Sequence, residues 1–381
     1  MPTMPSRSGT ATSAPSSPAV TFLLLQEARK GLLLFFVGGS DYKCILSGKY
    51  LSSHKRTIIS SDVRSPEKLL WTLAGIAAAL LIIFLGIKLF DGRSPQAVFV
   101  HEVIGFRALD MKKYAEDKAD LSDKGTIEVP TGFKFPRPVR EYRVEGMQVF
   151  EVAPADDSKL VLLYLHGGGY CHNFAKQHWK ALAGWADEAG CGVVAPNYPL
   201  LPLRTAADAH PPVMALYRDL LGRYPADRIV IAGDSAGGGF TLALAQKIRD
   251  ASIDLPRHFI LIAPWVDILG GDAFLQKHDN WLTVEALPKF GLDWADGIDP
   301  KDPVVSPLYG HMEGLPPTDI YAGTWDVLYT DVVKAYDKMK AAGVDVRLHV
   351  GEKMDHVYPL LPTPEGKAAR KEIAEILSGK R

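Results

Sequence analysis

The chain has 381 residues, and its 43 Lys and Arg residues almost balance its 44 Asp and Glu residues, for a formal net charge of −1. This balance argues against nucleic-acid binding, which needs a basic surface, and a content of 47% hydrophobic residues excludes a wholly disordered chain. Three scattered cysteines, Cys44, Cys171 and Cys191, are too few for a disulfide framework or a zinc site built on thiolates.

The N-terminal 68 residues show no clear core pattern. Residues 1–20 are mostly Ser, Thr, Ala and Pro, which bury too little apolar surface to offset the chain entropy lost on folding. The apolar runs at 23–25 and 32–37 are much shorter than a bilayer core requires. We therefore expect residues 1–68 to be a disordered, low-complexity segment.

Residues 69–87 read LLWTLAGIAAALLIIFLGI, which is 19 residues without a charge, between Lys68 and Lys88. We predict a transmembrane helix at residues 69–90, because this length fits a bilayer and a soluble helix normally keeps one polar face. A buried core helix and a cleaved signal peptide are the alternatives. Basic residues just before the run outnumber those just after it. This bias favours a single-pass protein with a cytoplasmic N-terminus and the large C-terminal part across the membrane.

Residues 91–381 are enough for one large α/β domain. Residues 97–122 are typical of a helix, and residues 140–144 and 147–152, hinged at Gly146, predict an antiparallel hairpin. Short apolar runs then alternate with helical stretches. The predicted strands are 160–165, 192–195, 228–232, 258–262, 319–322 and 346–350, and the predicted helices are 177–189, 207–221, 236–250, 327–342 and 364–377.

This alternation predicts an α/β fold with a mostly parallel central sheet flanked by helices. Ligands of such sheets bind outside the carboxyl ends of the strands, so functional groups are expected in the loops that follow strands.

Two glycine-rich loops directly follow predicted strands. Residues 166–170 read HGGGY, and three consecutive glycines indicate that backbone N–H groups approach another group closely. Residues 233–239 read GDSAGGG between a predicted strand and a helix. They match G-x-S-x-G, in which a sharp turn lifts a serine hydroxyl above the sheet, so Ser235 is a candidate nucleophile. A flexible loop and a chance match are the alternatives.

A serine hydroxyl needs a base that takes its proton and a third group that orients the base. Asp326 and His356 each follow a later predicted strand, which gives the order Ser, Asp, His that is expected of α/β-hydrolases. Asp326 is also typical of a helix N-cap, and Asp331 and Asp355 are alternatives for the acid.

Other histidines lack this placement, and we expect structural or surface roles for His172, His178, His210, His258 and His349. No H-E-x-x-H pair occurs, so we expect no metal site. The turn at 233–239 has Ser235 where G-x-G-x-x-G needs its second glycine, which argues against a nucleotide site.

In combination, four motifs resemble the hormone-sensitive-lipase-like family of α/β-hydrolases, also called α/β-hydrolase fold-3. They are HGGGY at 166–170, GDSAGG at 233–238, GTWDVLYTD around Asp326 and MDHVYPL around His356. The resemblance spans about residues 138–378 and implies an esterase or lipase without a cofactor, acting on a small-molecule ester of short or medium acyl chain. It also implies that Ser235 is the nucleophile, His356 the base and Asp326 the acid.

The resemblance further implies an oxyanion hole formed by the N–H groups of Gly167, Gly168 and Ala236. The motif residues that support it are His166, Gly169, Gly233 and Gly237. Family members usually cover the site with a cap, which residues 96–135 and 266–306 would supply here. The acid loop departs from the family's common Asp-Pro-Leu, because Val327 replaces the proline.

Two other functions remain as alternatives. A membrane span before such a hydrolase is similar to the layout of arylacetamide and steryl-acetate deacetylases, which suggests a membrane-anchored deacetylase or amidase of lipophilic acetates. A non-catalytic binding module is the alternative from another class, because fold does not imply function. The joint presence of Ser235, Asp326 and His356 argues against it.

Overall fold

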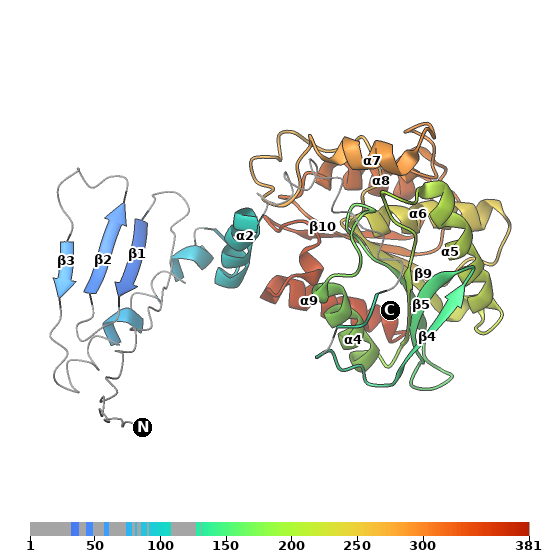
Figure 1. Ribbon diagram of the computed structural model, residues 1–381, viewed down its shortest axis with the longest axis horizontal. Coiled ribbons are helices and arrows are strands. Elements are labelled where there is room, and N and C mark those ends of the chain that lie inside the picture. The colour runs from blue at the N-terminus through green and yellow to red at the C-terminus, as the bar shows by residue number, and fades with distance from the viewer. Residues whose placement is uncertain are drawn as a thin grey trace, which may run out of the picture. The chain divides into compact units, whose positions relative to one another are not determined.

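The chain divides into two compact units, Met1–Gly86 and Ile87–Arg381. The computed structural model describes residues 32–37, 43–48, 57–60, 74–77, 81, 85–89, 91–107, 127–130 and 132–380. Figure 1 shows that the larger unit is built around a twisted sheet.

The first unit contains a three-stranded antiparallel sheet. Its strands are β1 (Leu32–Val37), β2 (Lys43–Gly48) and β3 (Thr57–Ser60), in the order β1-β2-β3. This differs from the disorder expected through residue 68. The strand sequences LLLFFV, KCILSG and TIIS contain short runs of apolar and β-branched residues, which favour extended pairing. Residues 1–20 lie outside the described residues.

The predicted transmembrane segment, residues 69–90, is described only at 74–77, 81 and 85–89, which are helical. Of the helices that the structure describes, none combines the length and the apolar character needed to cross a bilayer. The other residues of the predicted span lie outside the described part of the chain.

The larger unit contains an eight-stranded sheet in the order β11-β10-β9-β8-β6-β7-β5-β4. The strands are β4 (Val139–Val144), β5 (Met147–Val152), β6 (Val161–Leu165), β7 (Gly192–Asn197), β8 (Ile229–Asp234), β9 (His258–Ile262), β10 (Thr318–Gly323) and β11 (Val346–Gly351). The pairs β4–β5 and β5–β7 are antiparallel, and all other neighbours are parallel. The predicted hairpin and the mostly parallel sheet are therefore confirmed.

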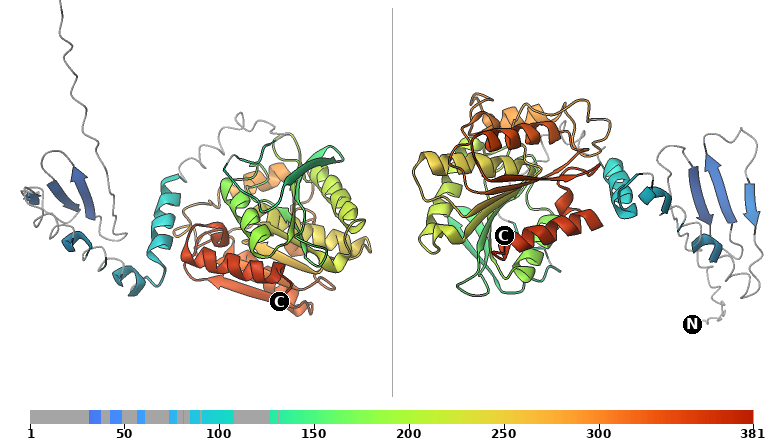
Figure 2. Two further views of the ribbon diagram at one scale, coloured as in Figure 1. Left: turned by 90° about the horizontal axis from the view of Figure 1, so that it is seen from below. Right: turned by 180° about the vertical axis from the view of Figure 1, so that it is seen from behind.

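Helices cover both faces of this sheet, as the views in Figure 2 show. The helices α4 (Lys176–Glu188) and α9 (Pro364–Leu377) pack in one apolar cluster, and α5 (Ala206–Leu221), α6 (Ser235–Asp250) and α8 (Tyr329–Ala341) pack in the other. Neighbouring strand residues alternate between the clusters, for example Leu162 and Leu163 of β6. This alternation follows because successive side chains of a strand point to opposite faces.

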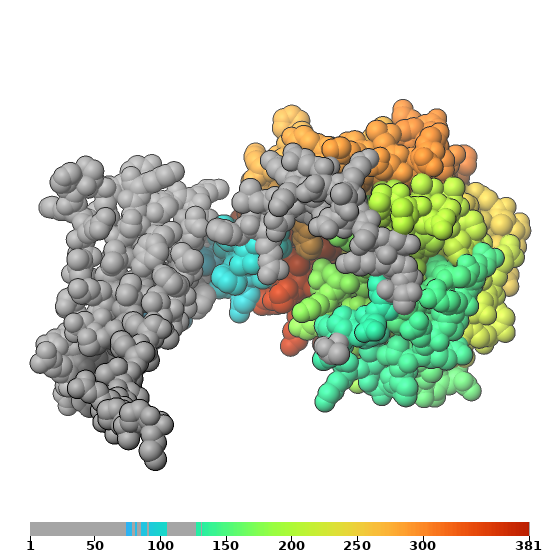
Figure 3. Space-filling view, viewed as in Figure 1, coloured from blue at the N-terminus to red at the C-terminus, as the bar shows by residue number. Residues whose placement is uncertain are grey.

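Two segments correspond to the predicted cap regions. The helix α2 (Pro95–Arg107) lies in the first, and the insertion between β9 and β10 contains α7 (Leu287–Ala295) in the second. The insertion forms much of the upper surface in Figure 3, where it is orange. The two segments touch, because Asn280 Nδ2 donates to the His101 carbonyl oxygen at 3.2 Å. Residues 108–126 lie outside the described part, and a covering role for these segments stays a prediction.

Candidate active site

Ser235 lies at the turn from β8 into α6 and has a φ of +51°. A left-handed backbone at a non-glycine residue is strained, by about 1–3 kcal/mol, and persists only where the surroundings impose it. Two glycines allow the turn to pack closely. A Cβ on Gly237 would overlap the carbonyl oxygen of Leu165, and a Cβ on Gly233 would overlap that of Gly237. The glycines of G-x-S-x-G are therefore required by the packing of this turn against β6 and against itself.

His356 lies between Ser235 and Asp326. Its Nε2 is 2.8 Å from Ser235 Oγ, and its Nδ1 is 2.7 Å from Asp326 Oδ2. The three residues are buried, with exposed fractions of 2% for His356, 9% for Ser235 and 0% for Asp326. Since the Asp326 carboxylate accepts a hydrogen bond from Nδ1–H, Nε2 is left as the acceptor for the serine hydroxyl. This arrangement can activate the hydroxyl as a nucleophile.

The two alternative acids have other partners. Asp331 lies in α8, where it pairs with Lys334 at 2.8 Å and accepts the Gly271 N–H at 3.0 Å. Asp355 pairs with His101 of α2. Of the three candidate acids, the structure thus brings Asp326 to His356.

Asp326 also keeps the cap-like contact that its position before a helix suggested. Its Oδ1 accepts the N–H of Leu328 at 2.8 Å, while its Oδ2 faces His356. Both oxygens of the carboxylate are therefore used, one by a backbone N–H and one by His356. These two bonds fix the orientation of the side chain.

Asp279 of the insertion is a buried carboxylate beside the acid loop, and no sequence motif indicates it. Its Oδ2 accepts the N–H of Val327 at 2.9 Å, and its Oδ1 accepts those of Trp281 and Leu282 at 2.7 and 2.8 Å. Burial and the nearby Asp326 carboxylate raise the pKa of Asp279 to about 6. The only sequence signal is an acidic residue before an apolar pair, which does not predict a contact 48 residues downstream.

The pKa of His356 is raised above its ordinary value of 6.5. Burial lowers this pKa, but the charge and hydrogen bond of Asp326 outweigh burial, with further contributions from the Asp279 and Asp234 carboxylates. The Trp281 ring packs edge-on against the imidazole, with centroids 5.9 Å apart. The site therefore favours the imidazolium that forms when His356 takes a proton.

Among the predicted oxyanion donors of the glycine loop after β6, Gly167 does not have a free N–H group. The N–H of Gly167 donates to Asp234 Oδ1 at 2.8 Å, so it is not available to an oxyanion. Neither Gly168 nor Gly169 donates its N–H to an acceptor among the described residues, and both have positive φ, +119° and +59°. The N–H of Ala236 lies in the first turn of α6, where N–H groups lack intrahelical partners. Gly168, Gly169 and Ala236 are therefore the available donors.

Asp234 anchors the glycine loop through a buried network. Besides the Gly167 N–H, it accepts the Tyr164 hydroxyl at 2.7 Å and His178 Nε2 at 3.2 Å. Burial raises the pKa of Asp234, but the electrostatic interaction with His178 and these hydrogen bonds outweigh burial and lower it. The residue before the nucleophile thus holds the loop that carries the candidate oxyanion donors.

Three other histidines bond to groups other than Ser235. His210 Nε2 lies 3.0 Å from the Val304 carbonyl oxygen, and burial lowers the pKa of His210 to about 3. His258 and His349 share the Asp319 carboxylate. Across the described ranges, no group of three or more His, Cys, Asp or Glu side chains is arranged to hold a metal ion.

His166, the first residue of the glycine loop, is buried, and its ring stacks on that of Tyr198 with centroids 4.5 Å apart. Burial lowers the pKa of His166 to about 3, so the ring is neutral. The Tyr198 hydroxyl donates to the His166 carbonyl oxygen at 2.6 Å. His166 therefore packs and orients the start of the loop.

Comparison with known proteins identifies the family. A family model described as alpha/beta hydrolase fold matches residues 162–360, which is more than half of the chain. This chain belongs to the hormone-sensitive-lipase-like family of α/β-hydrolases. The resemblance predicted from the four motifs is thus confirmed.

Relatives of this hydrolase include an acetyl-hydrolase and an esterase. It is 34% identical to an acetyl-hydrolase of Streptomyces hygroscopicus, over 57% of this chain and 75% of that protein. It is 30% identical to an esterase of Acinetobacter venetianus, over 62% of this chain and 81% of that protein. A solved esterase of the bacterial hormone-sensitive lipase family matches with a TM-score of 0.65 and 30% identity, over 75% of this chain and 98% of that one. The hydrolase is an ester-hydrolysing enzyme, which disfavours the non-catalytic binding module.

Proposed function

We propose that the hydrolase is a serine esterase that cleaves carboxylic esters of short to medium acyl chain through an acyl-enzyme on Ser235. The observation that carries this proposal is the buried hydrogen-bonded chain from Ser235 through His356 to Asp326, with distances of 2.8 and 2.7 Å. Such a chain supplies what a serine hydroxyl lacks, a base and a group that orients the base.

In the first half of the reaction, Ser235 Oγ attacks the ester carbonyl carbon while His356 Nε2 takes the hydroxyl proton. The carbonyl π bond becomes an oxyanion on a tetrahedral carbon. When this intermediate collapses, the C–O bond to the alcohol breaks, and His356 gives its proton to the leaving oxygen. The acyl group then remains on Ser235, and the neutral alcohol departs.

In the second half, a water molecule attacks the acyl-enzyme and gives one proton to His356. The second tetrahedral intermediate collapses, the bond to Ser235 Oγ breaks, and His356 returns the proton to that oxygen. The carboxylic acid leaves and the free enzyme is restored. Throughout, Asp326 stays ionised, holds the imidazole tautomer and stabilises the imidazolium.

The oxyanion of both intermediates would be bound by the N–H groups of Gly168, Gly169 and Ala236. Since Gly167 donates to Asp234, its part is to hold the loop in place rather than to bind the oxyanion. One oxyanion donor is typically worth about 10² to 10³ in rate.

A deacetylase or amidase of lipophilic acetates is the second candidate. The name of the Streptomyces hygroscopicus relative, an acetyl-hydrolase, favours acetate as an acyl group. A paired comparison of acetyl esters with acetamides of the same aromatic leaving group separates the two candidates. Faster cleavage of the amide, relative to the ester, would favour the amidase.

We also propose that residues 69–90 anchor the hydrolase in a membrane, with the N-terminus cytoplasmic and the catalytic domain on the opposite side. The uncharged run between Lys68 and Lys88 and the basic excess before it support this topology. The test is extraction of membranes with alkaline carbonate, followed by protease protection in sealed vesicles. Release by carbonate would contradict an anchor, and digestion of the catalytic domain from the cytoplasmic side would contradict the orientation.

The esterase is tested with p-nitrophenyl esters from acetate to palmitate, using detergent-solubilised full-length protein. We expect turnover to peak at short or medium chains and Ser235→Ala to lose on the order of 10⁶ in kcat. Ser158→Ala, which changes an exposed turn serine, is the matched control and should keep full activity. A Ser235→Ala protein that still turns over, or a fluorophosphonate probe that labels another serine, would overturn the assignment.

A further inference from the structure

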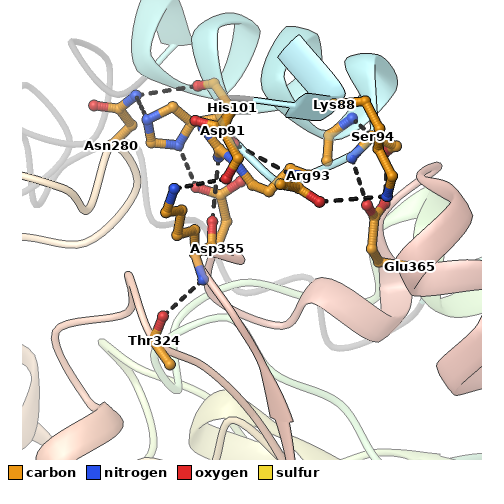
Figure 4. Close-up of polar contacts among 12 residues, drawn as sticks. Lys88, Asp91, Arg93, Ser94, His101, Asn280, Thr324, Asp355 and Glu365 are labelled. Atoms are coloured by element: carbon orange, nitrogen blue, oxygen red, sulfur yellow. Dashed lines mark hydrogen bonds and ion pairs between the residues drawn. The ribbon is translucent and has the colours of Figure 1, made fainter. Parts of the chain in front are cut away.

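Arg93, just before α2, and His101, within α2, contact the chain neighbours of the proposed acid and the proposed base. Trp325 directly precedes Asp326, and Asp355 directly precedes His356. Figure 4 shows His101 of α2 against Asp355, with Arg93 close by. Residues more than two hundred positions upstream thus meet both loops that carry the site.

His101 and Asp355 form a buried pair, with exposed fractions of 8% and 3%. Nδ1 of His101 faces Oδ1 of Asp355, and Nε2 lies 3.0 Å from Asn280 Nδ2. The same amide nitrogen donates to the His101 carbonyl oxygen. Since an amide nitrogen only donates, Nε2 accepts, and Nδ1 carries the proton that it donates to Asp355. Both ring nitrogens are therefore used, and the ring is fixed in one tautomer.

Trp325 is held by aromatic and cationic contacts from several elements. The Arg93 guanidinium lies 4.0 Å from the centroid of its ring, and the His101 ring centroid lies 4.9 Å away. His278 of the insertion also stacks on the indole, at 5.0 Å and an angle of 10°. Arg93 in turn donates to Asp91 at 2.7 Å. These contacts restrain the residue next to the acid.

The acid and base loops are also bonded to each other. The Trp325 N–H donates to the Met354 carbonyl oxygen at 3.1 Å, and the Lys353 N–H donates to Thr324 Oγ1 at 2.7 Å. Lys353 Nζ donates to the Asp91 carbonyl oxygen at 2.6 Å, and Arg93 donates to the Lys353 carbonyl oxygen at 3.2 Å. The two loops and the segment before α2 therefore form one connected structure.

We infer that His101 and Asp355 are positioning residues, which hold the base loop so that His356 stays between Ser235 and Asp326. This inference rests on the proposed function. Loss of the His101 imidazole would leave the buried Asp355 carboxylate without its donor, and the loop would shift to satisfy it. Because His356 is the next residue, such a shift moves the imidazole away from Ser235 Oγ. A displacement of about 1 Å can lower a rate by about 10²-fold.

The test separates positioning from folding by measuring the rate constant and the stoichiometry of Ser235 labelling with a fluorophosphonate probe. Rates are measured on the full-length protein and normalised to the labelled sites. For His101→Ala and Asp355→Ala we expect full final labelling with a rate constant lowered about 10- to 100-fold. The double variant should lose no more than the slower single variant, because the two side chains act as a pair. Asp355→Asn keeps an acceptor for His101 and should recover most of the rate.

Glu365→Ala is the matched control. Glu365 accepts the N–H and hydroxyl of Ser94 at 2.6 and 2.7 Å, so this variant loosens the same segment from α9 without touching either loop. Its labelling rate constant should stay within about twofold of wild type, as for changes away from the site.

An unchanged rate constant per labelled site in both alanine variants would overturn the inference. Fewer labelled sites with an unchanged rate constant would also overturn it, because that result would indicate a folding defect. If Asp355→Ala does not fold, His101→Ala and Asp355→Asn carry the same test. Wild-type protein that is not labelled at Ser235 would instead overturn the proposed function itself.

Discussion

The Asp279 carboxylate accepts the backbone N–H of Val327 at 2.9 Å, and Val327 directly follows the proposed acid Asp326. This contact joins the insertion between β9 and β10 to the loop after β10. It also places two buried carboxylates close together, and burial together with the Asp326 charge raises the pKa of Asp279 to about 6. Asp279 thus has two effects: it holds the acid loop in place, and its negative charge raises the pKa of His356.

Replacement of Asp279 by Asn tests this link. The amide has one acceptor oxygen and cannot accept all three N–H groups that the carboxylate holds, so we expect kcat to fall by roughly tenfold. The variant also removes a negative charge that raises the pKa of His356, so the acid limb of kcat/KM should move to lower pH. Asp272→Asn, at another acid of the insertion that bonds Thr330, is the control. An acid limb that does not move would contradict the electrostatic role.

The pH dependence of the wild-type enzyme follows from His356. The imidazole must be neutral to take the serine proton, and its pKa is raised above 6.5. We therefore expect kcat/KM to be low in acid and to rise with pH through a midpoint above 6.5. Steady-state rates across this range, with stability checked at each pH, measure the midpoint. A midpoint below that of an ordinary histidine would show that another group limits the rate.

Asp326→Asn should lower kcat by about 10⁴, because the amide no longer holds the productive tautomer of His356. It also removes the main contribution that raises the pKa of His356, so the acid limb of the residual activity should shift to lower pH. Asp331→Asn is the matched control, since Asp331 bonds Lys334 and Gly271 instead. Loss of activity in the control and not in Asp326→Asn would reassign the acid.

Gly239 of α6 packs against the loop after β9 and leaves no room for a side chain. A Cβ there would overlap the Trp265 carbonyl oxygen, so Gly239→Ala should lower the free energy of unfolding by about 1–3 kcal/mol. Gly184 of α4 has no atom within 4 Å of an added Cβ, so Gly184→Ala should raise that free energy by about 0.5–1 kcal/mol. Denaturant unfolding of both variants measures the difference. If both variants changed the free energy of unfolding by the same amount, the contact of α6 with Trp265 would have shifted to accommodate the methyl group.

The sequence by itself determined the sheet, the flanking helices and the candidate nucleophile. Strands such as β5 and β9 match their predicted bounds, because an apolar run between turn residues is a local pattern. Ser235 could be found because its turn needs small residues at fixed spacing in one stretch of chain. The strands at residues 32–60 were missed, because such short apolar runs do not reveal their pairing.

Only the tertiary structure decided which side chains meet at the site. Asp326, Asp331 and Asp355 carry the same side chain, so the sequence does not distinguish them. Their partners depend on how the loops after β10 and β11 pack. The Gly167 N–H donates to Asp234, which lies 67 positions away in the chain. The Val327 N–H donates to Asp279, which lies 48 positions away. Hydrogen bonds of this kind form only when the donor and acceptor lie within a few tenths of an ångström of the optimal distance, and a linear pattern does not contain the separation of distant segments.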